Sequence, residues 1–116
     1  MQRNDLEVAE KKFKTSLEMS LQSGYRRGIA NSYNYLGLIE EDKGDFSKSI
    51  NLHQKSLMIF EEIEDKRGES DALVNLGRMY HRLEDFEKRD NCIRKATKIK
   101  RKHGFVIDQS IIDAGY

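Results

Sequence analysis

The feature that most constrains this chain is an internal repeat with a period of 40 residues. Residues 27–48 align with residues 67–88 without a gap, and the match continues downstream. A fixed period of this length is typical of proteins in which one supersecondary unit stacks on the next. The identical pairs are Arg27/Arg67, Gly28/Gly68, Leu36/Leu76, Gly37/Gly77, Asp45/Asp85, Phe46/Phe86, Lys48/Lys88, Asn51/Asn91, Lys55/Lys95 and Ile59/Ile99.

The composition favours helices within each unit. The chain has 116 residues and no proline, and it is rich in Glu, Lys, Leu and Arg, which are good helix formers. Apolar residues recur at steps of three and four, the spacing of one helix face. We therefore predict helices over residues 5–23, 27–43, 46–62, 68–83 and 86–103, with a further helix starting within 105–116.

The expected turns also follow the repeat. Asp45 and Asp85 directly precede predicted helices, where an aspartate accepts hydrogen bonds from free backbone N–H groups. Gly24 and Gly104 share one register position at predicted helix ends, where glycine adopts the left-handed conformation. Glu64 takes that position in the middle repeat, so we expect that turn to close without a glycine.

Two glycines fall inside predicted helices rather than at their ends. Gly37 and Gly77 lie in the apolar stripe of each first helix, beside Leu36 and Leu76. Glycine in a helix interior costs about 1 kcal/mol relative to alanine. The simplest reason to keep it is a neighbouring helix that approaches too closely for a Cβ atom. The sequence therefore predicts a tight helix crossing at each glycine.

These residues resemble the signature of the tetratricopeptide repeat family, in which a large residue precedes Leu-Gly and a Tyr follows. The period is longer than the standard 34 residues, the usual closing proline is absent, and Glu40 replaces the Tyr in the earlier repeat. The chain is thus similar to the long-repeat branch, seen in G-protein-signalling modulators of the LGN and Pins type and in bacterial regulators. The residues that match best are Leu73, Leu76, Gly77 and Tyr80.

The resemblance implies an all-α fold, with antiparallel helix-turn-helix repeats stacked as a right-handed superhelix. We expect one domain over residues 1–116. It would contain a half repeat, two repeats and a partial repeat, and we expect it to be part of a longer array. These units are residues 5–23, 27–64, 67–103 and 105–116.

Catalysis, cofactors and metal binding are not expected. His53, His81 and His103 are far apart and lack the spacing of a metal motif, and Cys92 has no cysteine partner. No apolar run approaches the roughly 20 residues of a membrane helix. The single cysteine and the absence of a visible signal peptide predict a cytoplasmic protein.

The strongest charge feature is the run 94–103, which holds six Lys and Arg residues and no acid. It could be a patch for nucleic acid or for an acidic partner, but an ordinary solvated helix face is the favoured interpretation. The net charge of only +1 supports this, so nucleic acid is not expected as a partner. Acidic residues lie one repeat earlier, within 61–65, which suggests lateral charge pairing along the stack.

In tetratricopeptide proteins the first helices line a concave groove, so the resemblance implies a peptide-binding face on these helices. Asparagine can hydrogen-bond a peptide backbone through both amide ends, and arginine can grip a carboxylate, for example of an acidic partner. The alternative is a solvated face without a ligand. The candidate peptide-binding residues are Asn31, Asn34, Tyr35, Leu38, Asp71, Asn75, Arg78, His81 and Arg82.

The sequence thus predicts a non-catalytic scaffold that binds a protein or peptide partner in the groove. One alternative is a self-assembly module, in which the terminal half repeats join molecules head to tail into a homo-oligomer. Another is a regulatory segment of a larger signalling enzyme or transcription factor.

Overall fold

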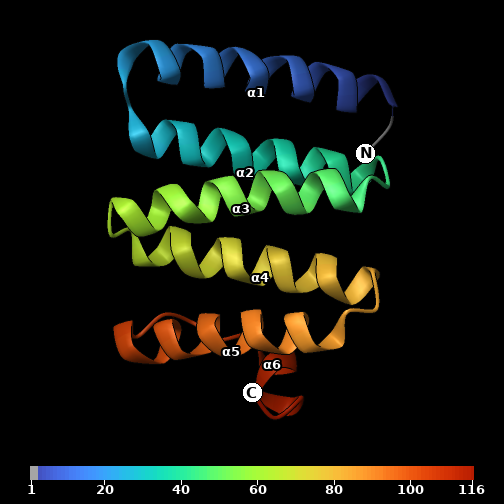
Figure 1. Ribbon diagram of the computed structural model, residues 1–116, viewed down its shortest axis with the longest axis vertical. Coiled ribbons are helices and arrows are strands. Elements are labelled where there is room, and N and C mark those ends of the chain that lie inside the picture. The colour runs from blue at the N-terminus through green and yellow to red at the C-terminus, as the bar shows by residue number, and fades with distance from the viewer. Residues whose placement is uncertain (1–2) are drawn as a thin grey trace.

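The computed structural model describes residues 3–116, and within them the chain is helical, with no strand (Figure 1). This confirms the predicted all-α fold. Residues 1 and 2 of the predicted domain lie outside the described residues. The helices are α1 (Arg3–Ser23), α2 (Arg26–Asp42), α3 (Phe46–Glu62), α4 (Lys66–Arg82), α5 (Phe86–His103) and α6 (Gln109–Asp113).

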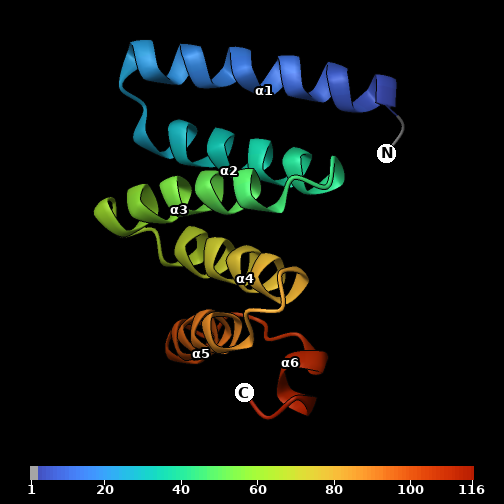
Figure 2. The ribbon, with the colours of Figure 1, turned by 45° about the vertical axis from the view of Figure 1, so that its right-hand side comes forward.

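The first five helices form a stack in which each packs on its neighbours in the sequence. Contacts join α1 to α2, α2 to α3, α3 to α4 and α4 to α5, and α2 also touches α4 directly. In Figure 2, α1 is seen from the side while α5 is seen nearly end-on, so the helix direction turns progressively down the stack. The predicted solenoid of helix pairs is therefore confirmed.

Aspartate side chains cap four helices, α3, α4, α5 and α6, and the first three caps share one geometry. The side chains of Asp45, Asp65 and Asp85 each accept a hydrogen bond from the backbone N–H three residues later, at 3.1, 3.0 and 3.3 Å. The caps at Asp45 and Asp85 confirm the prediction. The cap at Asp65 was not predicted, and it starts α4 two residues earlier than expected, at Lys66.

The turns keep one backbone geometry whether or not they contain glycine. Gly24 and Gly104 have φ values of +71° and +72°, and Glu64 holds the same register position with φ of +57°. The turns from α2 to α3 and from α4 to α5 also share one geometry, with Gly44 at φ +83° and Glu84 at φ +59°. The middle repeat therefore closes without a glycine, as predicted, by placing a glutamate in the left-handed region.

The two interior glycines lie at tight helix crossings, as predicted. A Cβ atom on Gly37 would lie 2.7 Å from the Cε1 atom of His53. A Cβ atom on Gly77 would lie 2.6 Å from the Cδ1 atom of Ile93. Because residues 53 and 93 share one register position, both crossings use the same pair of sites on the two helices.

The buried face of α3 is more polar than its apolar residues suggest. Ser49, His53 and Ser56 are fully buried. The Ser49 hydroxyl donates to the backbone oxygen of Gly37 at 2.7 Å, and the Ser56 hydroxyl donates to that of Ala30 at 2.9 Å. Small side chains here let α2 and α3 approach closely, and their hydroxyls find partners on the neighbouring backbone.

Candidate functional site

Two adjoining hollows lie along the first helices, and together we call them the first-helix groove. The first has a volume of about 230 Å³ and lies between α2 and α4. The second, of about 470 Å³, lies between α1 and α2 and shares Asn31 and Tyr35 with the first. The side chains of the first hollow that matter below are Arg27, Asn31, Asn34, Tyr35, Arg67 and Asp71.

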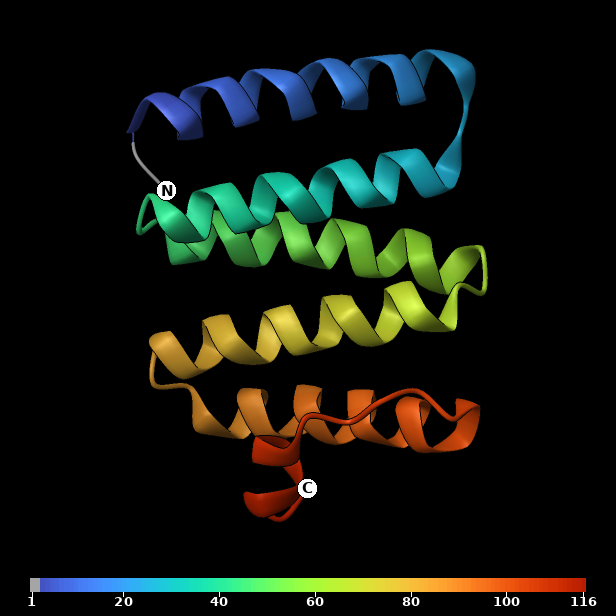
Figure 3. The ribbon, with the colours of Figure 1, turned by 180° about the vertical axis from the view of Figure 1, so that it is seen from behind.

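The link between α5 and α6 shows which face of the stack carries this groove. The guanidinium of Arg67 lies 4.2 Å from the ring centroid of Phe105, a residue of that link. The link crosses in front of α5 in Figure 3 and behind it in Figure 1. The first-helix groove therefore lies on the face turned toward the viewer in Figure 3.

An aromatic pair separates the two hollows. Tyr35 is half exposed, and its ring stacks on Phe13 of α1 with 4.6 Å between centroids and 13° between planes. This ring contact joins α1 to α2 and holds the Tyr35 ring in place as an apolar surface. A rigid aromatic surface of this kind supplies contact area at a low cost in conformational entropy.

Asn31 and Asp71 are two exposed polar side chains of the first hollow. They are one period apart, and neither side chain makes a hydrogen bond or an ion pair within residues 3–116. Partial burial raises the pKa of the Asp71 carboxyl, and the positive charges of Lys100 and Arg67 oppose this rise. An amide and a carboxylate are thus both available to a ligand in this hollow.

Asn34 and Asn75, by contrast, are part of a network inside the stack. The Asn75 amide donates to the side-chain oxygen of Asn34 at 3.0 Å, and the Nδ1 atom of His53 lies 2.7 Å from that same oxygen. Asn34 therefore joins α2, α3 and α4. These two contacts hold the Asn34 side chain in place, and Asn34 also lines the first hollow.

Arg78 is engaged with a carboxylate of its own chain. Its Nε and Nη2 atoms donate to the two oxygens of Glu41 at 3.0 and 2.8 Å. These hydrogen bonds hold the pKa of the Glu41 carboxyl below its usual range. The arrangement joins α2 to α4, and a carboxylate ligand would have to compete with Glu41 for this arginine.

The remaining predicted residues also contact their own chain. The Nδ1 atom of His81 accepts from Arg89 at 2.9 Å, and the Arg82 guanidinium lies 5.5 Å from the ring centroid of Phe46. Leu38 is half-buried. The structure thus divides the predicted set, placing Asn31, Asn34, Tyr35 and Asp71 around the first hollow and leaving Leu38, Asn75, Arg78, His81 and Arg82 outside it.

Arg27 and Arg67 line the first hollow although they were not among the candidate residues. Each precedes Asn31 or Asp71 by one helical step of four, and the two arginines form one of the identical pairs of the repeat. Both signals were visible in the sequence. The sequence could not predict a role for Phe13, because its stacking on Tyr35 depends on how α1 packs against α2.

The predicted lateral pairing between residues 61–65 and the basic run 94–103 is wrong. Glu62 instead pairs with Arg26, and Asp65 pairs with Arg27 at 3.1 Å. The reason is geometric, because the end of α3 lies next to the start of α2, its antiparallel neighbour. Within residues 3–116, the Lys and Arg side chains of the run 94–103 make no ion pair with an acid.

Other kinds of site find no support in the described residues. No group of three His, Cys, Asp or Glu side chains among residues 3–116 is arranged to hold a metal ion. Cys92 is half-buried, and burial raises the pKa of its thiol, which favours the less reactive protonated form. Over the same residues, every helix lacks the combined length and apolarity needed to cross a membrane.

Comparison with known proteins identifies the architecture. No curated protein matches the chain. The family model described as the tetratricopeptide repeat matches residues 28–102, which is well over half of the chain. Members of this family are typically non-catalytic protein-interaction modules. The matched region contains both glycine crossings and most of the first hollow, and the chain therefore belongs to the tetratricopeptide repeat family.

Proposed function

We propose that the protein is a scaffold that holds an extended peptide segment of a protein partner in the first-helix groove. The observation that carries this proposal is the pair Asn31 and Asp71, whose polar groups line one hollow without a partner of their own. An extended peptide presents N–H and C=O groups in alternation. Asn31 can bond to both, and Asp71 can accept from an N–H group.

The arrangement favours a segment that brings a hydrogen-bond donor or a positive charge to Asp71. Arg78 is already paired with Glu41, and Arg27 is paired with Asp65. Asp71 is therefore the acid of the first hollow that makes no ion pair within residues 3–116. An acidic segment stays the alternative, and Arg67 would receive it, because within residues 3–116 its guanidinium lies over the ring of Phe105 and makes no ion pair.

The test begins by selecting binding peptides from a random library against the intact protein. We expect the double variant Asn31→Ala, Asp71→Ala to bind a selected peptide about tenfold more weakly, the loss of one to two hydrogen bonds. The matched control is Asn51→Ala, Asn91→Ala, which removes two exposed amides from the second helices. Equal affinity for the parent and the groove variant would refute the proposal.

Self-assembly is a second candidate because one side of α1 is uncovered. Met19 is 65% exposed, whereas Ile59, at the same register position on α3, is 7% exposed beneath the helix that covers it. We propose that a second copy covers this side of α1. Sedimentation over a wide concentration range should then show association in the parent and much less in Met19→Glu. A parent that stays monomeric would exclude this candidate.

The period of 40 residues supports placing the protein in the long-repeat branch of the family. A regulatory segment of a larger signalling enzyme or transcription factor stays a further alternative for the function. A cytoplasmic location is a separate part of the proposal. The sequence that flanks residues 1–116 in the gene would test both.

A further inference from the structure

A second groove lies on a different face of the stack, between α3 and α5 and over α4. It has a volume of about 340 Å³, and we call it the second-helix groove. On α4 it uses Leu73, whereas the first-helix groove uses Asp71, about 200° away around the helix axis. Its floor is apolar and its rim is charged. The lining residues are Leu57, Leu73 and Ile99, with Glu61, Glu69, Lys95 and Lys98 at the rim.

Two lysines on the α5 side of the rim have no acid paired with them among the described residues. Lys95 and Lys98 make no ion pair within residues 3–116, although two acids line the same groove. One of those acids, Glu69, is already paired with Lys66 at 3.1 Å. The exposed surface of α5 beyond these lysines continues with Arg94 and Lys102, and no acid occurs between residues 91 and 103. A partner seated here would therefore meet an excess of positive charge along the α5 side.

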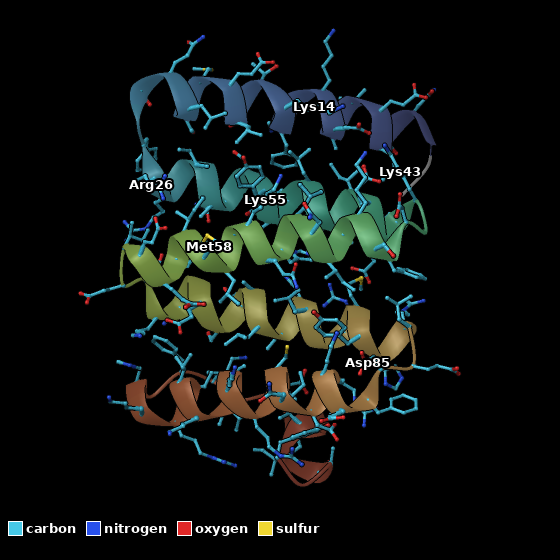
Figure 4. The ribbon with its side chains drawn as sticks, in the orientation of Figure 1. Lys14, Arg26, Lys43, Lys55, Met58 and Asp85 are labelled. Atoms are coloured by element: carbon cyan, nitrogen blue, oxygen red, sulfur yellow. The ribbon has the colours of Figure 1, made fainter. Side chains whose placement is uncertain are left out.

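The same place one repeat earlier shows how the floor continues. Lys55, in the register of Lys95, lies 5.5 Å from the ring centroid of Tyr33, in the register of Leu73. Met58, in the register of Lys98, is 63% exposed. Figure 4 labels Lys55 and Met58 on α3. An apolar floor beside a basic side chain is thus repeated along the stack.

We propose that the second-helix groove binds an amphipathic helix of a protein partner whose apolar stripe is flanked by acidic side chains. The apolar stripe would lie on Leu57, Leu73 and Ile99, and the acids would pair with Lys95 and Lys98. A helix offers apolar side chains at steps of three and four with charges beside them, which is the pattern that such a groove accepts. Nucleic acid fits less well, because no aromatic ring for base stacking is among the residues that line the second-helix groove.

The test uses a fluorescein-labelled synthetic helix with a leucine stripe flanked by glutamates, and a matched peptide with lysines in place of the glutamates. Fluorescence anisotropy at near-physiological salt should show binding of the acidic peptide and not of the basic one. Lys95→Glu with Lys98→Glu should weaken the acidic peptide about tenfold or more, as reversal of direct charge contacts requires. The matched control, Lys11→Glu with Lys12→Glu, makes the same charge change on exposed lysines of α1 and should leave binding unchanged.

A second measurement locates the peptide. Methyl NMR should show shifts at Leu57, Leu73 and Ile99 and none at Leu38, which lies outside this groove. Binding should also survive the first-helix variant Asn31→Ala, Asp71→Ala, so this proposal and the peptide-groove proposal fail independently.

Several results would overturn the proposal. One is equal binding of the two peptides, and another is equal loss in the α5 and α1 variants, since both indicate non-specific charge attraction. A third is a DNA duplex that binds while the acidic peptide does not. A fourth is a dimer of the protein itself that Lys95→Glu with Lys98→Glu dissociates, since the occupant would then be a second copy.

Discussion

The two complete repeats share one backbone plan but fill their crossings differently. In the first, Gly37 meets His53, a fully buried ring that bonds to Asn34 through Nδ1. Its Nε2 atom is buried without a hydrogen-bond partner among the described residues. In the second, Gly77 meets Ile93, a purely apolar side chain.

This difference separates what the fold requires at a crossing from what the first repeat adds to it. The fold needs a glycine on one helix and a side chain of moderate size on the other, and both repeats provide them. The histidine adds a connection, because its partner Asn34 lines the first hollow. A buried polar group that is only partly satisfied costs stability. Exceptions of this kind are expected near functional sites, and here the histidine bonds to a residue that lines the proposed groove.

The largest effect should come from filling the crossings. We expect Gly37→Leu to destabilise the protein by about 3 kcal/mol or more and Gly77→Leu by about 1–3 kcal/mol. The His53 ring is fully buried and tied to Asn34, whereas the Cδ1 atom that Gly77 meets is the flexible end of Ile93. Urea unfolding of both variants measures the difference. Equal losses would show that the two crossings are equally rigid, and melting at or above the parent temperature would show that neither is tight.

The next effect concerns pH. Burial, reinforced by the charge of Arg78 and opposed by Glu41, lowers the pKa of His53 from 6.5 to about 4. The unfolded chain therefore takes up this proton first as the pH falls. The contribution of His53 to stability is full above pH 6.5 and declines between pH 6.5 and 4 by about 3 kcal/mol. Urea unfolding at both pH values should show this loss in the parent.

His53→Ile, which copies the other repeat, should lack that part of the acid loss. At pH 7 we expect it to lie within about 1 kcal/mol of the parent, since it loses one hydrogen bond but removes an unpartnered nitrogen. The reverse change, Ile93→His, should cost about 2 kcal/mol, because Val74 holds the register of Asn34 and cannot accept a hydrogen bond. If the acid loss is the same with and without His53, other groups cause it.

Much of the fold followed from the sequence, because the repeat, the glycines and the caps act locally. The register predicted both crossings and the aspartate caps at Asp45 and Asp85. Part of the candidate site did not follow. Arg78 and Arg82 share a face of α4 with Asn75, but the sequence does not show that Glu41 lies within reach from α2. Pairing between helices depends on their twist and offset, and the stack alone provides these.

A smaller effect tests the equivalence of the repeats at their turns. Asp45→Ala and Asp85→Ala should each cost about 1 kcal/mol, since each removes one cap hydrogen bond of similar length. Thermal unfolding of the two single variants measures this directly. A loss at one turn only would show that the caps differ in strength despite their shared register. The double variant should lose about the sum, because the two caps share no hydrogen-bond partner.

The smallest effect is a gain of stability at the turns that lack glycine. Glu64 and Glu84 have φ values of +57° and +59°, a region that costs a residue with a Cβ atom about 1–2 kcal/mol. Glycine avoids this strain but has more freedom to lose on folding. We therefore expect Glu64→Gly and Glu84→Gly to stabilise the protein by about 0.5–1 kcal/mol each.

The matched reverse change, Gly24→Glu, should destabilise it by a similar amount, since a Cβ atom there meets open space and only the backbone strain counts. Urea unfolding of the three variants separates strain from contact. If the glycine variants are less stable than the parent, the two glutamates make favourable interactions that outweigh their backbone strain, and the turns of the two repeats are not equivalent.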